Sequence, residues 1–211
     1  NPNIRLSLPS KGRLQDDSIE LLAECGLPIQ KLNPRQYQAK MPALPELNVL
    51  FQRPSDIVIS VRQGSVDFGI TGIDVLEENR GDNGDIIVLH DALGFGSCSL
   101  MLAVPESWSD VTNIESLKSY AATLDQPLRV ATKFPVLTER FLKQQNIPHT
   151  LIAAEGTLET APTIGYADII SDLVSSGQTL QDNRLRALRD GVVQASQAAL
   201  IANRKALETN P

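Results

Sequence analysis

Apolar and polar positions alternate along the chain with two different periods, and segments of the two kinds follow one another from end to end. Short stretches such as Ile4–Leu8 and Asp67–Thr71 are apolar or alternate residue by residue, which is typical of strands. Longer stretches such as Leu14–Cys25 and Pro135–Gln145 repeat apolar residues at helical spacing. This succession predicts an α/β fold with mostly parallel sheets covered by helices.

The alternation runs through the chain twice, over about 90 residues each time, which predicts two lobes. We expect lobe I to hold residues 1–92 and 178–211, including a strand over 194–201 and a last helix from about Asn203. Lobe II is expected to hold residues 93–177. Ligands of such folds bind at the carboxyl ends of strands, so we expect the site there, between the lobes.

One segment is open to two interpretations. Ile57–Val61 is β-branched and suits a strand, but Pro54 in front of it is typical of a helix start and Gly64 behind it of a helix end. We favour a short helix. Before this segment, Tyr37–Met41 and Asn48–Gln52 flank a Pro-containing turn and predict a hairpin.

The composition is that of a globular protein, with 42% hydrophobic and 21% charged residues among 211. The longest uncharged stretch, Ala92–Pro105, is too short to span a bilayer, which excludes a membrane protein. Two cysteines and no secretory leader indicate a reducing compartment, so we expect a cytoplasmic protein. The net charge of −6 argues against nucleic-acid binding.

Charge is unevenly distributed along the chain. Residues 63–125 hold 2 Lys/Arg against 11 Asp/Glu, whereas basic residues gather towards both ends. A protein that handles a small polyanion could place local cations on an acidic body in this way. An acidic surface unrelated to any ligand explains the pattern equally well.

The sharpest motif is an apolar strand that ends in an acid and is followed by a loop of hydroxyl residues. Asp172 ends the strand, and Ser175, Ser176, Gly177 and Thr179 follow it. Backbone N–H groups and three hydroxyls can surround one phosphate there, because Gly177 permits close approach of the backbone. Asp172 would repel that phosphate and suits a sugar hydroxyl or a metal-bridged pyrophosphate. An ordinary Ser/Gly turn is the alternative.

Two earlier loops could also hold a ligand. Lys11, Gly12 and Arg13 lie between the first strand and the first helix, where two cations and helix N–H groups can converge on one anion. A basic surface turn is the alternative. Gly72 opens a helix directly after a strand, and the neighbouring Thr71 or Asp74 could hydrogen-bond a base or a ribose.

Residues suited to covalent catalysis are not grouped in the sequence. His90 and His149 stand far apart with no evident partner, and we expect structural or surface roles for both. No Cys/His or Ser/His/Asp constellation presents itself. This leaves direct transfer between two bound substrates, with anion clamps as the main catalytic device.

These motifs, in this order, resemble the short form of ATP phosphoribosyltransferase, the first enzyme of histidine biosynthesis. The resemblance rests on Leu8–Leu14, Asp67–Leu76, Arg129–Pro135 and residues 155–180. It implies a fold like that of the type II periplasmic binding proteins. Because the sequence ends at residue 211, without the histidine-binding domain of the long form, the resemblance points to the short form. Short-form chains are expected as a homodimer within a hetero-oligomer that contains a regulatory subunit similar to histidyl-tRNA synthetase.

The implied reaction is attack of adenine N1 of ATP on C1 of phosphoribosyl pyrophosphate. Pyrophosphate leaves, and Mg²⁺ is carried by the substrate pyrophosphate rather than by a metal site of the protein. The resemblance implies catalytic roles for Arg13, Glu159 and Arg35, the last reaching a neighbouring subunit's site. It implies substrate binding by Lys11, Gly12, Thr71, Gly72, Asp74, Phe134, Asp168, Asp172, Ser175, Ser176, Gly177 and Thr179.

Within this set, Phe134 stands where many members of the family have tyrosine, so only stacking on adenine or ribose is expected of it. The main rival interpretation is a non-catalytic two-lobe anion-binding protein or the effector-binding domain of a regulator. Another phosphoribosyltransferase is disfavoured, because the usual strand ending in two adjacent acids before a Thr/Gly loop is absent.

Overall fold

A computed structural model describes residues 4–31, 33, 36–154 and 156–209. The chain divides into two compact units, which we call unit 1 (Asn1–Ser97 with Ser196–Pro211) and unit 2 (Cys98–Ala195). The first boundary lies close to the expected one. The second does not, since residues 178–195 belong to unit 2 rather than to the first lobe.

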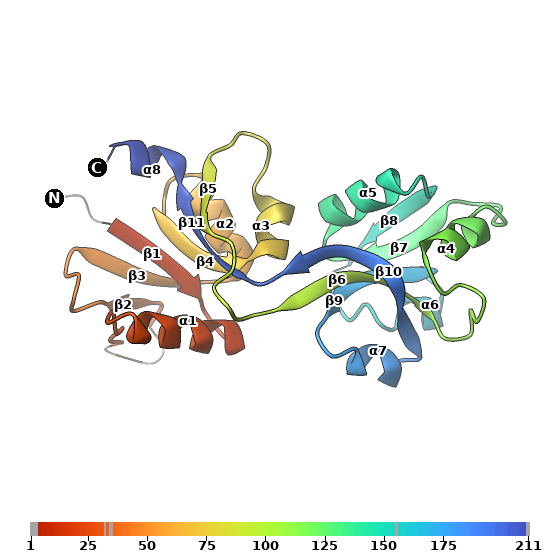
Figure 1. Cartoon of the computed structure of the whole chain (residues 1–211), viewed down its shortest axis with the longest axis horizontal. Coiled ribbons are helices and arrows are strands. Elements are labelled where there is room, and N and C mark those ends of the chain that lie inside the picture. The colour runs from red at the N-terminus through yellow and green to blue at the C-terminus, as the bar shows by residue number, and fades with distance from the viewer. Residues whose placement is uncertain (1–3, 32, 34–35, 155, 210–211) are drawn as a thin grey trace. The chain divides into compact units, whose positions relative to one another are not determined.

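Unit 1 contains a six-stranded mixed sheet in the order β2-β3-β1-β4-β11-β5 (Figure 1). Strand β1 is parallel to β3 and β4, while β2–β3, β4–β11 and β11–β5 are antiparallel pairs. The strands are β1 (Ile4–Pro9), β2 (Gln38–Lys40), β3 (Leu47–Gln52), β4 (Phe68–Gly72), β5 (Ile86–His90) and β11 (Ala198–Asn203). The helices are α1 (Arg13–Glu24), α2 (Pro54–Arg62), α3 (Ile73–Asn79) and α8 (Arg204–Thr209).

Unit 2 contains a five-stranded mixed sheet in the order β10-β6-β9-β7-β8. Strand β7 is parallel to β8 and β9, and β9 is antiparallel to β6. The strands are β6 (Cys98–Pro105), β7 (Leu128–Thr132), β8 (His149–Ala153), β9 (Ile169–Val174) and β10 (Leu185–Ser196). The helices are α4 (Ile114–Ala121), α5 (Pro135–Gln144), α6 (Ala161–Ile164) and α7 (Gln178–Asp182).

The two sheets share one arrangement of strands. In each, a central strand (β1 or β7) has two parallel neighbours, and an antiparallel strand (β11 or β6) follows on one side. The expected two-lobed α/β fold is therefore confirmed. The sheets are mixed rather than mostly parallel, because unit 1 contains the antiparallel pairs β2–β3, β4–β11 and β11–β5, and unit 2 the antiparallel pair β6–β9.

The ambiguous segment after β3 is helical, as favoured. Pro54 occupies the first turn of α2, where its missing N–H removes no hydrogen bond. Ile57 and Val61 are buried against β4. Gly69 of β4 makes this packing close, since a Cβ there would lie 2.5 Å from Ile57 Cγ2. The predicted hairpin of β2 and β3 is also present.

The strand expected over residues 194–201 is two strands. β10 ends at Ser196 and β11 begins at Ala198, because Gln197 between them turns its backbone oxygen to the N–H of Ile73. Strand β10 begins as early as Leu185 and lies at the edge of the unit 2 sheet. This pairing is why residues 178–195 belong to unit 2.

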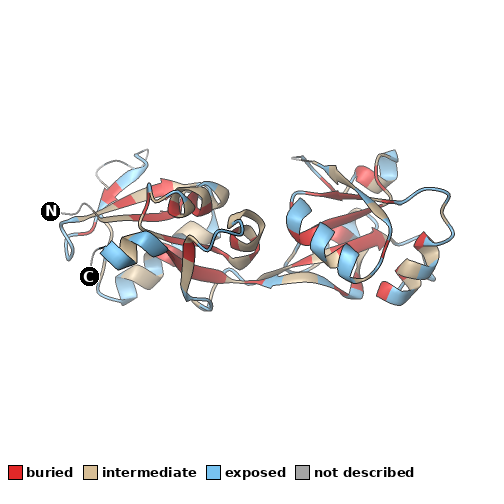
Figure 2. Ribbon diagram, turned by 90° about the horizontal axis from the view of Figure 1, so that it is seen from above, coloured by how far each residue is buried: buried red, intermediate tan, exposed pale blue. Residues whose placement is uncertain are grey.

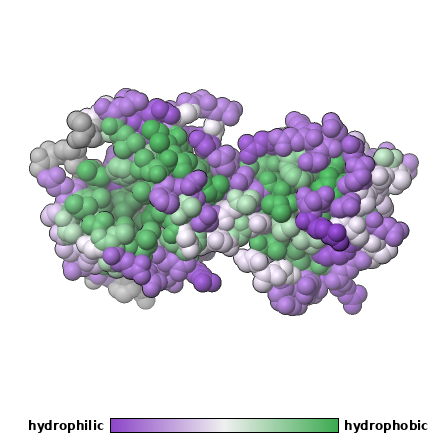
Figure 3. Space-filling view, viewed as in Figure 1, coloured by the Kyte–Doolittle hydropathy of each residue, from purple (hydrophilic) through white to green (hydrophobic). Residues whose placement is uncertain are grey.

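Each unit has an apolar core of its own, as the buried clusters of described residues show. Buried residues follow the strands, and the outward faces of the helices are exposed (Figure 2). On the face seen in Figure 3, apolar residues gather in the middle of each unit and hydrophilic ones surround them. Both units therefore bury enough apolar surface to form rigid supports for the loops at their strand ends.

Candidate active site

A pocket of about 170 Å³ lies at the carboxyl end of β9 in unit 2. It brings together the six residues expected to hold or act on the phosphoribosyl group: Glu159, Asp172, Ser175, Ser176, Gly177 and Thr179. Leu173, Val174 and Leu180 complete the lining. The hydroxyl-rich motif is thus the wall of a cavity, and Glu159, which precedes α6, faces the same space.

The loop between β9 and α7 is shaped by a left-handed glycine and a local hydrogen bond of Ser176. Gly177 caps α7 with φ 78°, a left-handed conformation that favours glycine. Ser176 Oγ accepts from the N–H of Gln178 at 3.3 Å. The exposed hydroxyls of Ser175 and Thr179 bond no partner within the described part of the chain. They are therefore free to donate to a bound anion.

Asp172 is the most perturbed group of the pocket. Burial raises the pKa of its carboxyl group, opposed by the N–H of Leu173, which donates to Oδ1 at 2.8 Å. The positive charge of Lys133 also lowers this pKa, and the negative charge of Glu159 raises it. Asp172 thus lies among a cation, a second carboxylate and a hydroxyl-rich loop, which suits it to accept hydrogen bonds from sugar hydroxyls.

Lys133 is a charged neighbour of Asp172 that sequence reasoning missed. It lies in the turn between β7 and α5, beside Phe134. The segment is one of those that carry the family resemblance, but nothing in the local sequence relates Lys133 to Asp172, which lies 39 positions further on. Only the pairing of β7 with β9 brings the two segments together.

Phe134 is placed differently from its expected role. The residue caps α5, and its N–H donates to Thr132 Oγ1 at 2.9 Å. Only 9% of it is exposed, so its ring contributes to the interior of unit 2 rather than offering a stacking surface. The expected contact with adenine or ribose has no exposed ring to support it in this structure.

The basic turn of unit 1 is fully accessible. Gly12 caps α1 with φ 75°, and no side chain caps the first N–H groups of this twelve-residue helix. The Arg13 side chain is 93% exposed, with Nε 3.6 Å from Asp17 Oδ2. Lys11 is exposed as well. The turn is therefore able to meet an anion with two cations and free helix N–H groups.

The third predicted motif serves the structure of unit 1. Asp74 is only 4% exposed, accepts from Ser196 Oγ at 2.6 Å and donates its N–H to the same oxygen at 3.0 Å. Thr71 is fully buried. A Cβ at Gly72 would lie 2.3 Å from Asp74 Oδ1, so glycine is needed for this junction. These groups are occupied within the fold and are not presented to a ligand.

Asp168 does not belong to the pocket that holds Asp172. Asp172 is the fourth residue of β9, whereas Asp168 lies directly before the first, Ile169. It accepts from the backbone N–H of Arg129 at 2.8 Å and from the guanidinium of Arg129 at 2.7 and 3.2 Å. Burial raises the pKa of Asp168, but these hydrogen bonds and the charge of Arg129 outweigh it and lower the pKa below its usual value.

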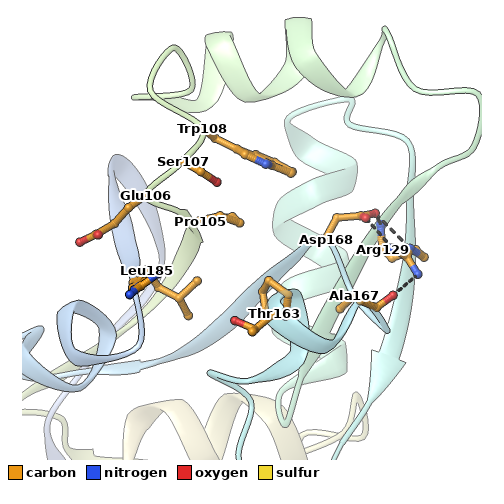
Figure 4. A pocket seen from close by; sticks show the side chains of 12 residues that line it. Pro105, Glu106, Ser107, Trp108, Arg129, Thr163, Ala167, Asp168 and Leu185 are labelled. Carbon is orange, nitrogen blue, oxygen red and sulfur yellow. Dashed lines mark hydrogen bonds and ion pairs between the residues drawn. The ribbon is translucent and has the colours of Figure 1, made fainter.

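The Arg129–Asp168 pair lines a second pocket of unit 2, of about 480 Å³. Figure 4 shows the pair on one side of this pocket and the indole of Trp108 on another. Arg129 also donates to the carbonyl of Gly165 at 2.9 Å. Asp168 and Arg129 thus form a clamp that joins the starts of β7 and β9.

Three further findings concern Arg35, metal ligands and membrane-spanning helices. Arg35 lies outside the described residues. Among the residues with a described position, no group of three or more His, Cys, Asp or Glu side chains could bind a metal ion. None of the helices described is both long enough and apolar enough to cross a bilayer.

Two mixed α/β units, one of which follows a strand with a hydroxyl-rich loop beside a carboxylate, define an α/β protein with a periplasmic-binding-protein-like fold. Solved structures share this fold. The periplasmic aliphatic sulphonate binding protein SsuA from Escherichia coli is 17% identical, with a TM-score of 0.54 over 100% of this chain and 68% of that one. The ATP phosphoribosyl transferase (HisG:HisZ) complex from Thermotoga maritima is 24% identical, with a TM-score of 0.75 over 98% and 90%.

Sequence comparisons then place the chain in a family. The family described as "ATP phosphoribosyltransferase" matches residues 53–211. ATP phosphoribosyltransferase of Chelativorans sp. is 40% identical over 96% of this chain and 91% of its own length. ATP phosphoribosyltransferase 2, chloroplastic, of Arabidopsis thaliana is 50% identical over 97% of this chain. The chain belongs to the ATP phosphoribosyltransferase family. It spans about half the length of the plant relatives that it matches.

Proposed function

We propose that this chain transfers the phosphoribosyl group of phosphoribosyl pyrophosphate to N1 of the adenine of ATP, the first step of histidine biosynthesis. Membership of the ATP phosphoribosyltransferase family supports this reaction. The observation that carries it is the pocket of unit 2, where Asp172, Glu159 and the loop over 175–179 face one cavity. A phosphate and a ribose need such neighbouring hydroxyl donors and carboxylate acceptors.

In the proposed reaction, the loop binds the 5-phosphate through the hydroxyls of Ser175, Ser176 and Thr179 and through backbone N–H groups. Asp172 and Glu159 accept hydrogen bonds from the ribose hydroxyls. The bond between C1 and the pyrophosphate oxygen breaks, and its electron pair leaves with pyrophosphate. The adenine N1 lone pair then bonds to C1. Positive charge that develops on the ribose is stabilised by the two carboxylates, because the pocket fixes them beside it.

The basic turn of unit 1 provides the second set of contacts. Both substrates are polyanions, and their phosphates repel each other unless cations lie beside them. Lys11 and Arg13 bind the pyrophosphate or the phosphates of ATP, with the N-terminal N–H groups of α1 as further donors. Arg35 would assist the leaving pyrophosphate from a neighbouring subunit.

Mg²⁺ fits the reaction as part of the substrate. Asp172 and Glu159 supply two carboxylates, and Mg²⁺ is commonly bound by one or two carboxylates together with substrate phosphates. When bound, the ion neutralises charge on the leaving pyrophosphate. The pyrophosphate carries the ion, and the carboxylates of Asp172 and Glu159 would hold it from the side of the pocket.

We also propose a partner for the chain. The structure from Thermotoga maritima is a complex of HisG with HisZ. By analogy we expect this chain to form a homodimer that associates with a regulatory subunit similar to histidyl-tRNA synthetase. Light scattering of the chain alone and with such a subunit measures both associations. A mass that stays that of one chain in both samples would contradict them.

The reaction is tested by incubating the full chain with ATP, phosphoribosyl pyrophosphate and Mg²⁺, with and without the candidate partner subunit. We expect release of pyrophosphate together with a rise in near-UV absorbance from the N1-substituted product. Omission of either substrate is the control. Binding of both substrates without pyrophosphate release would favour the rival interpretation, a non-catalytic anion-binding protein.

A further inference from the structure

Three buried hydroxyl groups form a hydrogen-bonded series behind the candidate active site. They belong to Thr132 of β7, Thr138 of α5 and Ser171 of β9, and all three residues are 0% exposed. Thr132 Oγ1 and Thr138 Oγ1 are 3.2 Å apart, and Thr138 Oγ1 donates to Ser171 Oγ at 2.9 Å. The N–H of Phe134 donates to Thr132 Oγ1 at 2.9 Å.

The direction of this series follows from its donors. A backbone N–H only donates, so Thr132 Oγ1 accepts from Phe134. Thr138 has one hydroxyl hydrogen, which it gives to Ser171, so its oxygen accepts from Thr132. The hydrogens therefore run one way from Phe134 to Ser171, and hydrogen bonds aligned in this way strengthen one another in a low-dielectric interior.

Both ends of the series lie next to residues linked to the candidate site: Lys133 acts on Asp172 through its charge, and Asp172 lines the pocket. One end is the turn that carries Lys133 and Phe134, and the other is Ser171, the residue before Asp172. The strand register pairs Thr132 with Ser171, so the β7 and β9 ends are already neighbours. Thr138 of α5 adds a second connection, because its hydroxyl is hydrogen-bonded both to Thr132 of β7 and to Ser171 of β9.

An apolar core would not need these hydroxyls. The adjacent Ala131 and Ile170 are fully buried, and Val or Ala at the three hydroxyl positions would fill similar volumes without polar groups to satisfy. Hydrogen bonds differ from apolar contacts in that they fix direction and distance. The series is thus suited to hold two loops in one relative position.

We propose that Thr138, together with Thr132 and Ser171, is a positioning residue that fixes Asp172 relative to the Lys133–Phe134 turn during phosphoribosyl transfer. The role rests on the proposed function. The charges agree with a position of Lys133 near Asp172. Burial and Glu159 raise the pKa of Asp172, while the charge of Lys133 lowers it. None of the three hydroxyls touches substrate in this role.

The test compares Thr138→Val, which removes the hydroxyl at nearly constant volume, with Thr138→Ser, which keeps it. Ser18→Ala is the matched control, because Ser18 is also 0% exposed and its hydroxyl bonds only Leu14 O within α1 of unit 1. We expect Thr138→Val to lower kcat/KM for phosphoribosyl pyrophosphate about tenfold or more, since small displacements of reacting groups have large effects on rate. Thr138→Ser and Ser18→Ala should stay within about twofold of the unsubstituted chain.

Hydrogen exchange gives a second measurement that does not need turnover. Thr138→Val should speed exchange in both segments, residues 133–138 and 171–177, whereas Ser18→Ala should change neither. Ser171→Ala breaks the same series at its other end and should have the same effects, and it replaces Thr138→Val if that variant does not fold.

Several outcomes would overturn the proposal. One is a lower melting temperature for Thr138→Val with unchanged kinetic constants, which indicates a structural role alone. Another is faster exchange confined to residues 133–138. No turnover by the unsubstituted chain would contradict the proposed function and this role with it. Turnover by that chain and equally by Thr138→Val would contradict the role alone.

Discussion

Units 1 and 2 begin their parallel strands in the same way. In unit 1, Asp67 accepts from the backbone N–H of Arg5 at 2.8 Å and pairs with its guanidinium, which also donates to Gly64 O. In unit 2, Asp168 makes the corresponding contacts with Arg129 and the carbonyl of Gly165. Each pair joins the starts of neighbouring parallel strands, β1 with β4 and β7 with β9.

The units differ at the opposite ends of the same strands. β4 passes through Gly72 directly into α3, and Asp74 closes the junction with Ser196. β9 is followed by three additional residues before α7, and these form the hydroxyl-rich loop over 175–177. The shared end therefore maintains the fold, while the end that differs carries the pocket. Loops at carboxyl ends of strands vary with less effect on the sheet.

The largest effect on activity is expected at Asp172. Asp172→Asn should lower kcat about a hundredfold, because a carboxylate beside the developing charge is lost. The same change should raise the melting temperature near neutral pH. Burial raises the pKa of Asp172, so its ionised form is unfavourable in the folded chain, whereas the amide carries no charge. Steady-state kinetics and thermal unfolding measure the two effects. A fall in both activity and stability would contradict this assignment.

The sign of the pH dependence follows from the raised pKa of Asp172. Protonated Asp172 favours folding below the unfolded pKa of about 4, and this contribution is lost as the pH rises through the folded value. The stability gained by Asp172→Asn should therefore shrink as the pH falls towards about 4.

A smaller effect is expected in the loop. Ser176→Ala with Thr179→Ala should raise KM for phosphoribosyl pyrophosphate at least about tenfold, because hydrogen bonds to a charged phosphate are lost. Ser109→Ala, which removes an exposed hydroxyl elsewhere in unit 2, is the control and should leave KM unchanged. An unchanged KM in the double variant would exclude the loop as the phosphate site.

Arg13 offers a matched comparison of two exposed ion pairs. Arg13–Asp17 and Lys143–Glu139 are both i,i+4 pairs on helices, one in each unit. Arg13→Ala should lower turnover about fivefold with little change in melting temperature, because such surface pairs add little stability. Lys143→Ala should change neither quantity. Equal kinetic constants for both variants would contradict a role of the basic turn in the reaction.

Substitutions in the ion pairs at the strand starts should affect stability and not activity. Asp67→Asn and Asp168→Asn should each lower the melting temperature by roughly several degrees, since hydrogen bonds to a charged group are weakened. Neither should change KM. Because Arg129 lowers the pKa of Asp168, its contribution is full above about pH 4 and is lost as the pH falls through the lower folded value. A large rise in KM for Asp168→Asn would contradict this and would indicate that Asp168 binds substrate.

Much of the fold could be predicted from the sequence, because the relevant signals are local. Proline at the start of α2 and the apolar spacing of α5 required no knowledge of distant residues. The hydroxyl-rich loop could likewise be recognised, since Asp172, Ser175 and Ser176 lie close together in the sequence. The first part of β10, residues 185–193, was missed because it belongs to an edge strand whose exposed positions carry Arg189 and Asp190, so it lacks the apolar run of a central strand.

Long-range pairing explains the other differences. Asp168 stands four residues before Asp172 in one conspicuous block, and only its partner Arg129, 39 residues earlier, reveals a structural role. Phe134 looks like a free aromatic residue in the sequence, but in the structure it is buried at the start of α5. The spacing Gly64–Asp67 recurs at Gly165–Asp168, and this repeat was a signal that sequence reasoning could have used.

The central claim is that the loop after β9, and not the junction after β4, holds the phosphoribosyl group. Hydrogen exchange of the full chain with and without Mg²⁺ and phosphoribosyl pyrophosphate tests it directly. We predict slower exchange over residues 172–180 and unchanged exchange over residues 71–76. Protection confined to 71–76, or none in either segment at saturating ligand, would contradict the account.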